Sequence, residues 1–196
     1  MDERMMKAEN IIFDIGKVLL TFSPEKVCEL IPKDVREDIY QAMFVPLGGH
    51  SRWEQFDLGA IPNAEIAKEI AEAAGHPEHA NSILYAMENF PFTTMEEKEL
   101  VQLLPTLKAM GKKLYCLTNY AEPAFSNTLK RFSFFEVMDG FVVSAREKMV
   151  KPDDAIFQKI LKKYALKPEK TLFIDDREEN VESAARNGLM TWHYTE

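Results

Sequence analysis

Four positions along the chain carry polar side chains that could act together on a phosphate group. In chain order they are Asp14, Thr118 with Asn119, Lys151, and Asp175 with Asp176. A carboxylate can attack phosphorus and form an acyl phosphate, which divides hydrolysis into two easier steps. Carboxylate and phosphate are both anions, so positive charge is required, from a lysine or a metal ion. Each position alone could be a turn, a helix cap or a surface lysine, but together they favour a catalytic site.

The first of these residues follows an apolar run that shows no alternation. Ile11, Ile12 and Phe13 directly precede Asp14, and such a run is typical of a strand buried on both faces of a parallel sheet. A carboxylate next to a buried strand is costly unless it has a partner. Because the carboxyl ends of parallel strands face the ligand crevice, we expect Asp14 to be the reactive residue.

The second half of the chain alternates short apolar runs with helical patterns. Further strands are predicted at residues 114–117, 141–143, 171–174 and 190–194. Helices are predicted from Thr94, as the capping residue, to Gly111 with a break at Pro105, and then at 123–132, 152–164 and 177–187. The alternation predicts parallel β-α-β units and therefore an α/β fold.

The segment from about residue 24 to residue 90 reads differently, because it has helical patterns and no strand-like alternation. Helices are predicted at 24–30, 34–44 and 51–58, then from Asn63 as the capping residue to Gly75, and after His76. We therefore predict an all-helical insert at residues 21–91, within a core of residues 1–20 and 92–196.

The order of the four motifs resembles that of the haloacid dehalogenase superfamily, most of whose members are Mg²⁺-dependent phosphohydrolases. The matching segments are FDIGKVL with Asp14, LTN with Thr118, VKPD with Lys151, and FIDDREEN with Asp175 and Asp176. The helical insert lies where that superfamily places its C1 cap. The resemblance implies a Rossmann-like parallel sheet core and a phosphatase that uses Mg²⁺.

The resemblance also implies a role for each matching residue. Asp14 would be the nucleophile and Lys151 the cation beside it. The phosphate would be bound by Ile15, Gly16, Thr118, Asn119 and Lys151. The Mg²⁺ would be held by Asp14, the carbonyl of Gly16, Asp175 and Asp176, with Asn180 as a supporting partner.

One position departs from the superfamily pattern. Most of its phosphatases carry a second Asp two residues after the nucleophile, as general acid and base, whereas this chain has Gly16. Such help is worth roughly 10²–10⁴-fold in rate. Three explanations stay open: a good leaving group, an acid from the helical insert (His50, Glu54 or His79), or a catalytically weak phosphate-binding regulatory protein. A similar subgroup with FDxGxV at this motif includes α-D-glucose-1-phosphate phosphatases, so a sugar 1-phosphate is the preferred substrate.

The insert offers a candidate substrate-facing surface. Trp53 and Phe56 are either a core-facing aromatic pair or, with Arg52 and Glu54, a cap face over Asp14. A metal-independent dehalogenase is a further alternative, but the Asp175 and Asp176 pair argues for phosphate rather than halide.

Composition limits the possible partners. The net charge of −8 disfavours nucleic acid and anionic membrane, which leaves a small phosphorylated metabolite as the expected partner. Cys28 and Cys116 are expected to be buried thiols, and no signal peptide is evident, so we expect a cytoplasmic protein. The sequence predicts no oligomeric state.

Overall fold

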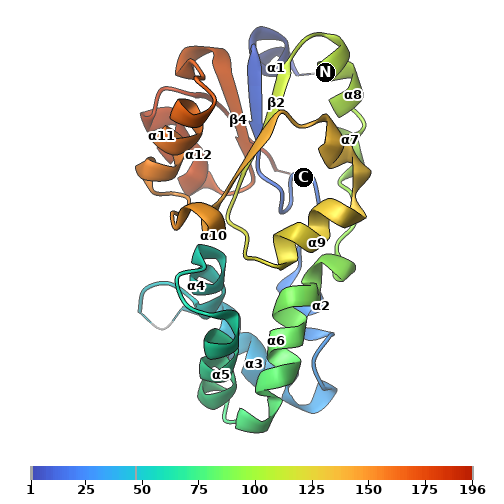
Figure 1. The fold of residues 1–196 in the computed structure, drawn as a ribbon, viewed down its shortest axis with the longest axis vertical. Helices are drawn as coiled ribbons and strands as arrows, with labels where there is room; N and C mark the ends of the chain where they lie inside the picture. The colour runs from blue at the N-terminus through green and yellow to red at the C-terminus, as the bar shows by residue number, and fades with distance from the viewer. Residues whose placement is uncertain (1, 47, 196) are drawn as a thin grey trace.

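A five-stranded parallel sheet forms the centre of the computed structural model, which describes residues 2–46 and 48–195 (Figure 1). The strand order is β3-β2-β1-β4-β5, and every neighbouring pair is parallel. The strands are β1 (Asn10–Phe13), β2 (Lys113–Thr118), β3 (Gly140–Val143), β4 (Thr171–Asp175) and β5 (Met190–His193). The predicted parallel α/β core is confirmed.

Strand β1 lies in the middle of the sheet because its apolar residues are covered on both faces. Ile11, Ile12 and Phe13 are fully buried. Successive side chains of a strand point to opposite faces, and accordingly Ile11 and Phe13 belong to one apolar cluster and Ile12 to another. The residue that follows β1 is therefore placed at the middle of the sheet edge.

Helices cover both faces of this sheet, as Figure 1 shows. On one side lie α11 (Asp154–Lys163) and α12 (Glu178–Arg186). On the other lie α7 (Lys98–Val101), α8 (Leu104–Ala109) and α9 (Ala124–Arg131). The shorter elements of this half are α1 (Glu3–Lys7), η4 (Ser133–Val137), α10 (Ser144–Glu147) and η5 (Pro168–Lys170).

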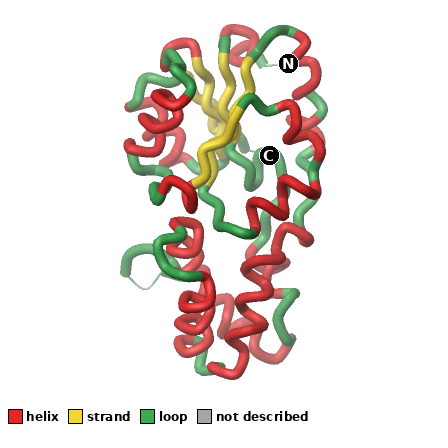
Figure 2. Tube along the Cα trace, in the orientation of Figure 1, coloured by secondary structure: helices red, strands yellow, loops and turns green. Residues whose placement is uncertain are grey.

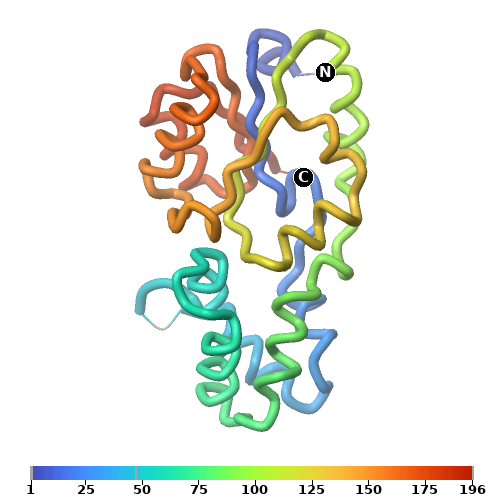
Figure 3. The backbone as a smooth tube through the Cα atoms, in the orientation of Figure 1, coloured from blue at the N-terminus to red at the C-terminus, as the bar shows by residue number. Residues whose placement is uncertain are grey.

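The remaining helices gather in a second lobe beyond the carboxyl ends of the strands (Figures 1 and 3). This helical lobe consists of α2 (Pro24–Cys28), η1 (Lys33–Val35), α3 (Arg36–Phe44), α4 (Arg52–Leu58), α5 (Asn63–Ala73), η2 (Pro77–His79), α6 (Ala80–Asn89) and η3 (Phe90–Thr93). Figure 2 shows the strands confined to the other half of the molecule. Among the described residues of 24–93 there is no strand, so the predicted all-helical character is confirmed.

Helix α4 begins and ends at the residues that its sequence predicts. The Ser51 side chain accepts the Glu54 amide hydrogen, and the Glu54 carboxylate accepts from the Ser51 amide, which together form a capping box. Gly59 ends the helix in the left-handed conformation, with φ of 63°. Both ends of this helix are thus fixed by local hydrogen bonds.

The predictions that Asn63 and Thr94 cap helices are wrong. Pro62 takes the capping position of α5, while the Asn63 side chain donates to the carbonyl of Glu122, 2.7 Å away in the sheet-bearing half. The Thr94 hydroxyl donates to the carbonyl of Pro91, and the next helix begins only at Lys98. Each side chain forms a different hydrogen bond instead of capping a helix: Asn63 bonds to a distant segment, and Thr94 bonds to a residue three positions earlier in the chain.

Two simpler expectations concern the cysteines and the membrane. Cys28 and Cys116 are buried free thiols, as predicted. Among the described residues, no helix has the length and apolar character needed to cross a bilayer.

Candidate active site

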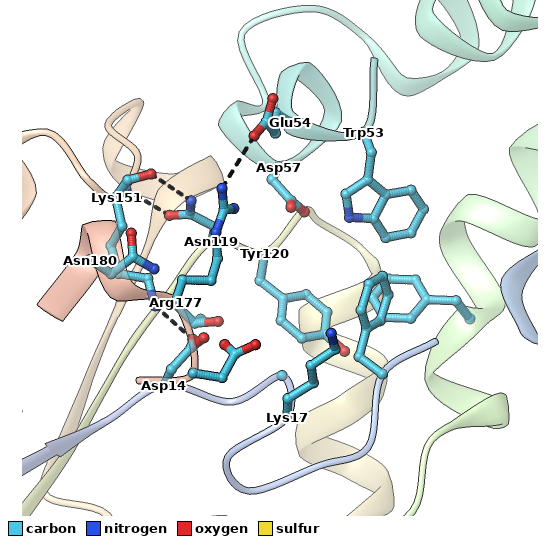
Figure 4. Close-up of a pocket in the computed structure, with 15 residues that line it drawn as sticks. Asp14, Lys17, Trp53, Glu54, Asp57, Asn119, Tyr120, Lys151, Arg177 and Asn180 are labelled. Carbon is cyan, nitrogen blue, oxygen red and sulfur yellow. Dashed lines mark hydrogen bonds and ion pairs between the residues drawn. The ribbon is translucent and has the colours of Figure 1, made fainter. Parts of the chain in front are cut away.

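The predicted site residues meet at the carboxyl edge of the sheet. Asp14 follows β1, Thr118 is the last residue of β2, and Asp175 is the last residue of β4. The backbone amide of Asp14 donates to the carbonyl of Ile174, so the chain stays in register with β4 beyond the end of β1. Asp14, Thr118, Lys151 and Asp176 line one cavity of about 350 Å³ (Figure 4).

Lys151 is the cation at the floor of this cavity. Its Nζ atom lies 2.8 Å from Asp14 Oδ1 and 2.6 Å from Asp175 Oδ2, and its side chain is almost fully buried. Burial disfavours the ammonium form, but the two carboxylates outweigh it and hold the pKa of Lys151 above its ordinary value. Lys151 therefore stays charged and partly neutralises the acidic cluster.

The loop that carries Lys151 is held by Asn119. The Asn119 side chain accepts from the Lys151 amide at 2.8 Å and donates to the Lys151 carbonyl at 2.9 Å. Both polar atoms of that side chain are thus used to position Lys151. The backbone amide is the part of Asn119 that could contact a phosphate.

The carboxylates of Asp14, Asp175 and Asp176 form one acidic cluster, with an oxygen atom of each within 4.8 Å of the others. Asp175 is fully buried and accepts hydrogen bonds from the Arg177 amide and the Asn180 side chain. Burial raises the pKa of Asp14 above its ordinary value; Lys151 opposes this rise and Asp175 adds to it. Burial, followed by Asp175, likewise raises the pKa of Asp176.

This cluster fits a magnesium ion. Three carboxylates with clustered oxygen atoms match the hard oxygen ligands that Mg²⁺ prefers. The buried Oδ1 atom of Asn180 has no hydrogen-bond partner among the described residues, although its Nδ2 atom donates to Asp175. A hydrated cation beside the cluster would supply the missing donor through a water ligand and relieve the repulsion among the acids.

The two residues after Asp14 differ in what they can contribute. The Ile15 side chain is fully buried in the apolar core, so the backbone is the part of Ile15 that could contact a ligand. Gly16 lines the cavity, and a Cβ atom added there would lie 3.8 Å from the nearest atom, in Phe22. A Cβ atom would therefore fit at this position, so steric crowding does not explain why the residue is glycine.

The opposite wall of the cavity comes from helix α4 of the helical lobe. Trp53, Glu54 and Asp57 all line it, and Figure 4 shows the Asp57 carboxylate directed into the cavity between the Trp53 ring and the Arg177 guanidinium group. Arg177, from the sheet-bearing half, forms an ion pair with Glu54 at 3.7 Å. The two lobes therefore meet across the cavity.

Four aromatic rings form one side of this wall: Phe22, Trp53, Phe90 and Tyr120. Ring centroids lie 5.6 Å apart for Phe22 and Trp53, 5.1 Å for Trp53 and Phe90, and 5.2 Å for Phe90 and Tyr120. A continuous cluster of aromatic rings, tilted relative to one another, therefore adjoins the charged floor of the cavity.

A model of haloacid dehalogenase-like hydrolases matches residues 8–188, which is most of the chain and includes all four motifs. The chain belongs to this family. Across 94% of the chain it is 28% identical to sesquiterpene phosphatase astK of Aspergillus oryzae, covering 89% of that protein.

Solved structures of the haloacid dehalogenase family share the fold. An enzyme from Bacteroides thetaiotaomicron, in complex with magnesium and inorganic phosphate, has a TM-score of 0.75 and 23% identity, over 94% of this chain and 93% of that one. L-2-haloacid dehalogenase from Xanthobacter autotrophicus has a TM-score of 0.66 and 15% identity, over 94% of this chain and 76% of that one. At such identities the likeness establishes the fold.

Within this haloacid dehalogenase-like fold, some predicted cap residues lie away from the site. The His50 side chain is mostly exposed. His79, the last residue of η2, lies beside His76. Neither His50 nor His79 lines the cavity. Arg52 donates instead to the carbonyl of Ala42. Phe56 is fully buried in the core, so of the predicted aromatic pair only Trp53 lines the cavity.

Sequence reasoning missed three charged residues that line the cavity: Lys17, Asp57 and Arg177. Lys17 lies three residues after Asp14, and Arg177 lies two residues after Asp175. Their closeness to the motif residues in the sequence could have indicated that they belong to the site. Asp57 lies inside an amphipathic helix, where a carboxylate ordinarily indicates the solvated face. No pattern in the sequence distinguishes it from such a residue.

Proposed function

We propose that this hydrolase is a Mg²⁺-dependent phosphomonoesterase that forms an aspartyl phosphate on Asp14. The observation that carries the proposal is the position of Asp14, which lies at the cavity floor 2.8 Å from Lys151 and within the acidic cluster. A carboxylate so placed can attack phosphorus, and the adjacent ammonium group can stabilise charge on the phosphoryl oxygens.

The remaining residues of the motifs bind and orient the phosphoryl group. The Thr118 hydroxyl and the backbone amides of Ile15, Gly16 and Asn119 are the donors available to its oxygen atoms. Asp14, Asp175, Asp176 and the carbonyl of Gly16 would hold Mg²⁺, with Asp176 facing the cavity and Asp175 fixed by its hydrogen bonds. When bound, the ion supplies the positive charge that lets two anions approach each other.

Residues 21–91 act, in this proposal, as a cap over the site. The support is that Phe22, Trp53, Glu54, Asp57 and Phe90 line the cavity from this segment. A cap that closes over the phosphate would exclude water and select the leaving group.

The leaving group, we further propose, is an alcohol with an extended apolar face. The aromatic wall favours this class, and the similar sesquiterpene phosphatase makes a terpenyl monophosphate the first candidate. A sugar 1-phosphate is the competing candidate, since an aromatic ring can also pack on a sugar. The structure supports a sugar 1-phosphate less, because Arg52, which was expected to bind sugar hydroxyl groups, does not line the cavity.

Phosphate release with and without Mg²⁺ tests these proposals. The substrates are farnesyl phosphate, glucose 1-phosphate, glucose 6-phosphate and p-nitrophenyl phosphate, with Asp14→Asn as the control. Release that needs both Mg²⁺ and Asp14 is expected, with the highest kcat/KM for farnesyl phosphate. A higher kcat/KM for glucose 1-phosphate would overturn the terpenyl assignment. Binding of phosphate without turnover of any ester would instead favour the regulatory protein.

A further inference from the structure

Hydrolysis of an alkyl phosphate needs a proton for the departing oxygen, and the motif residues do not provide one. Lys151 is committed between Asp14 and Asp175. The residue two positions after Asp14 is Gly16, which has no side chain to donate. An alkoxide is a poor leaving group in water, so a proton donor elsewhere in the cavity would accelerate the reaction.

Most other titratable groups of the cavity already have partners. Glu54 accepts hydrogen bonds from Ser51 and pairs with Arg177. The Tyr120 hydroxyl is hydrogen-bonded to Thr128. These interactions leave Asp57 as the uncommitted carboxyl group on the wall opposite Asp14.

Asp57 is 8% exposed, and its carboxylate points into the cavity (Figure 4). No described residue forms a hydrogen bond with that carboxylate. A buried carboxyl group without a partner is costly, and this one faces the cavity from the wall opposite Asp14.

The backbone around Asp57 is fixed to the sheet-bearing half. The buried Ser144 hydroxyl, in α10, donates to the carbonyl of Asp57. Lys148 donates to the carbonyl of Gly59, and an added Cβ at Gly59 would lie 2.9 Å from the Cβ of Ala145. The end of α4 is therefore held against the core, which places the Asp57 carboxyl group over the site.

The surroundings of this carboxyl group favour its protonated form. Burial raises the pKa of Asp57 well above its usual value, and the negative charges of Asp14 and Glu54 raise it further. Arg177 and Lys151 oppose this rise to a smaller extent. A carboxyl group whose pKa is raised in this way is better suited to donate a proton to a leaving group than an ordinary aspartate is.

We propose that Asp57 is the general acid and base of this hydrolase, delivered from helix α4. This inference rests on the phosphatase function proposed above. It assigns to the opposite wall of the cavity the role that Gly16 cannot perform.

The two steps balance as follows. In the first, an Asp14 oxygen forms a bond to phosphorus and the bond from phosphorus to the ester oxygen breaks. The electron pair stays on that oxygen, which takes the Asp57 proton and leaves as an alcohol. In the second, the Asp57 carboxylate takes a proton from a water molecule while the oxygen of that water attacks phosphorus. The bond to Asp14 breaks, phosphate leaves, and Asp57 is protonated again.

The test compares Asp57→Asn with wild type on esters whose leaving groups differ in basicity. The probes are p-nitrophenyl phosphate, phenyl phosphate and hexyl phosphate with Mg²⁺, and the matched control is Asp34→Asn, an exposed position of the helical lobe. For Asp57→Asn we expect kcat/KM to fall about 10²–10⁴-fold for hexyl phosphate and only a few-fold for p-nitrophenyl phosphate. Nitrophenol should appear as a burst before slow turnover, because the aspartyl phosphate then lacks its base.

An equal loss of kcat/KM for all three esters, or no loss for hexyl phosphate, would overturn the role of Asp57. Asp57→Ala is measured in parallel, and circular dichroism confirms that each variant is folded. The failure of the phosphatase function itself would look different. In that case wild type would release no phosphate from any ester, or Asp14→Asn would remain active.

Discussion

The ammonium group of Lys151 lies 2.8 Å from the Asp14 carboxylate, and both side chains are buried. The same ammonium group contacts Asp175, so one cation serves two carboxylates at the edge of the sheet. Removing one partner of such a buried set leaves uncompensated charge, which is much more costly than losing a surface ion pair.

Lys151→Met should therefore destabilise the protein by about 3–5 kcal/mol, measured by urea unfolding without Mg²⁺. Lys68→Met is the matched control, because Lys68 forms an exposed ion pair with Glu72 within a helix and should cost less than about 0.5 kcal/mol. Added Mg²⁺ should restore part of the loss in Lys151→Met by compensating the same carboxylates. Equal losses in the two variants would contradict this account.

Asp14→Asn should lower phosphate release by about 10⁴-fold or more, because the amide cannot form the aspartyl phosphate. The variant should fold normally, since Asn has the same shape and removes one charge from a crowded acidic cluster. Phosphate release and urea unfolding, measured on the same preparation, check both statements. Activity close to that of wild type would remove Asp14 as the nucleophile.

Asp176→Ala should weaken Mg²⁺ binding at least ~10–100-fold, which is the typical loss when a group that merely supports a metal ligand is removed. The reason is that Asp176 lines the cavity, whereas Asp175 is occupied by internal hydrogen bonds. Isothermal titration with Mg²⁺ measures the affinity. Glu169→Ala, at an exposed position, makes the same charge change and serves as the control. A similar affinity in both variants would argue against Asp176 as a ligand.

The positions of the motif residues could be predicted because backbone geometry determines them. Apolar runs before Asp14, Thr118 and Asp175 indicate buried parallel strands, and parallel strands end at a common edge. Lys151 was predicted from its motif, and the structure brings it to the same edge.

What could not be predicted depends on contacts between distant segments. Asp57 looks like a solvated helix residue until α4 is placed on α10, more than 80 residues later. Asn63 looks like a helix cap until Glu122 is found beside it. Similarly, Trp53 and Phe56 are both aromatic residues of one helix, and the sequence does not distinguish them. Only the packed structure shows that Trp53 lines the cavity while Phe56 is fully buried in the core.

Gly59→Ala should destabilise the protein and weaken the contact between the two lobes. The residue has φ of 63°, which costs a residue with a side chain about 1–2 kcal/mol, and its added Cβ would approach Ala145 to 2.9 Å. Thermal unfolding should show the loss. Gly111→Ala has a similar φ of 79° and nothing within 4 Å of the added Cβ, so it isolates the backbone cost from the clash. Equal destabilisation in both variants would indicate that the contact with Ala145 does not matter.

Asp57→Asn should be more stable than wild type at neutral pH, and the difference should depend on pH. The pKa of Asp57 is raised by burial in the folded protein, whereas in the unfolded chain it is about 3.9. Between these two values the folded state binds more protons than the unfolded state, so the stability of wild type falls as pH rises. Each unit by which the folded pKa exceeds the unfolded one lowers wild-type stability by about 1.4 kcal/mol once the pH exceeds both.

Asn carries no charge, so the stability advantage of Asp57→Asn should be absent below about pH 3.9 and grow as pH rises above it. Urea unfolding at a series of pH values, without Mg²⁺, measures the difference between variant and wild type. Asp34→Asn, which makes the same change of side chain at an exposed position, is the control. A variant less stable than wild type at neutral pH would mean that the ionised Asp57 carboxylate is stabilised where it lies. That outcome would conflict with a group that retains its proton for the leaving alcohol.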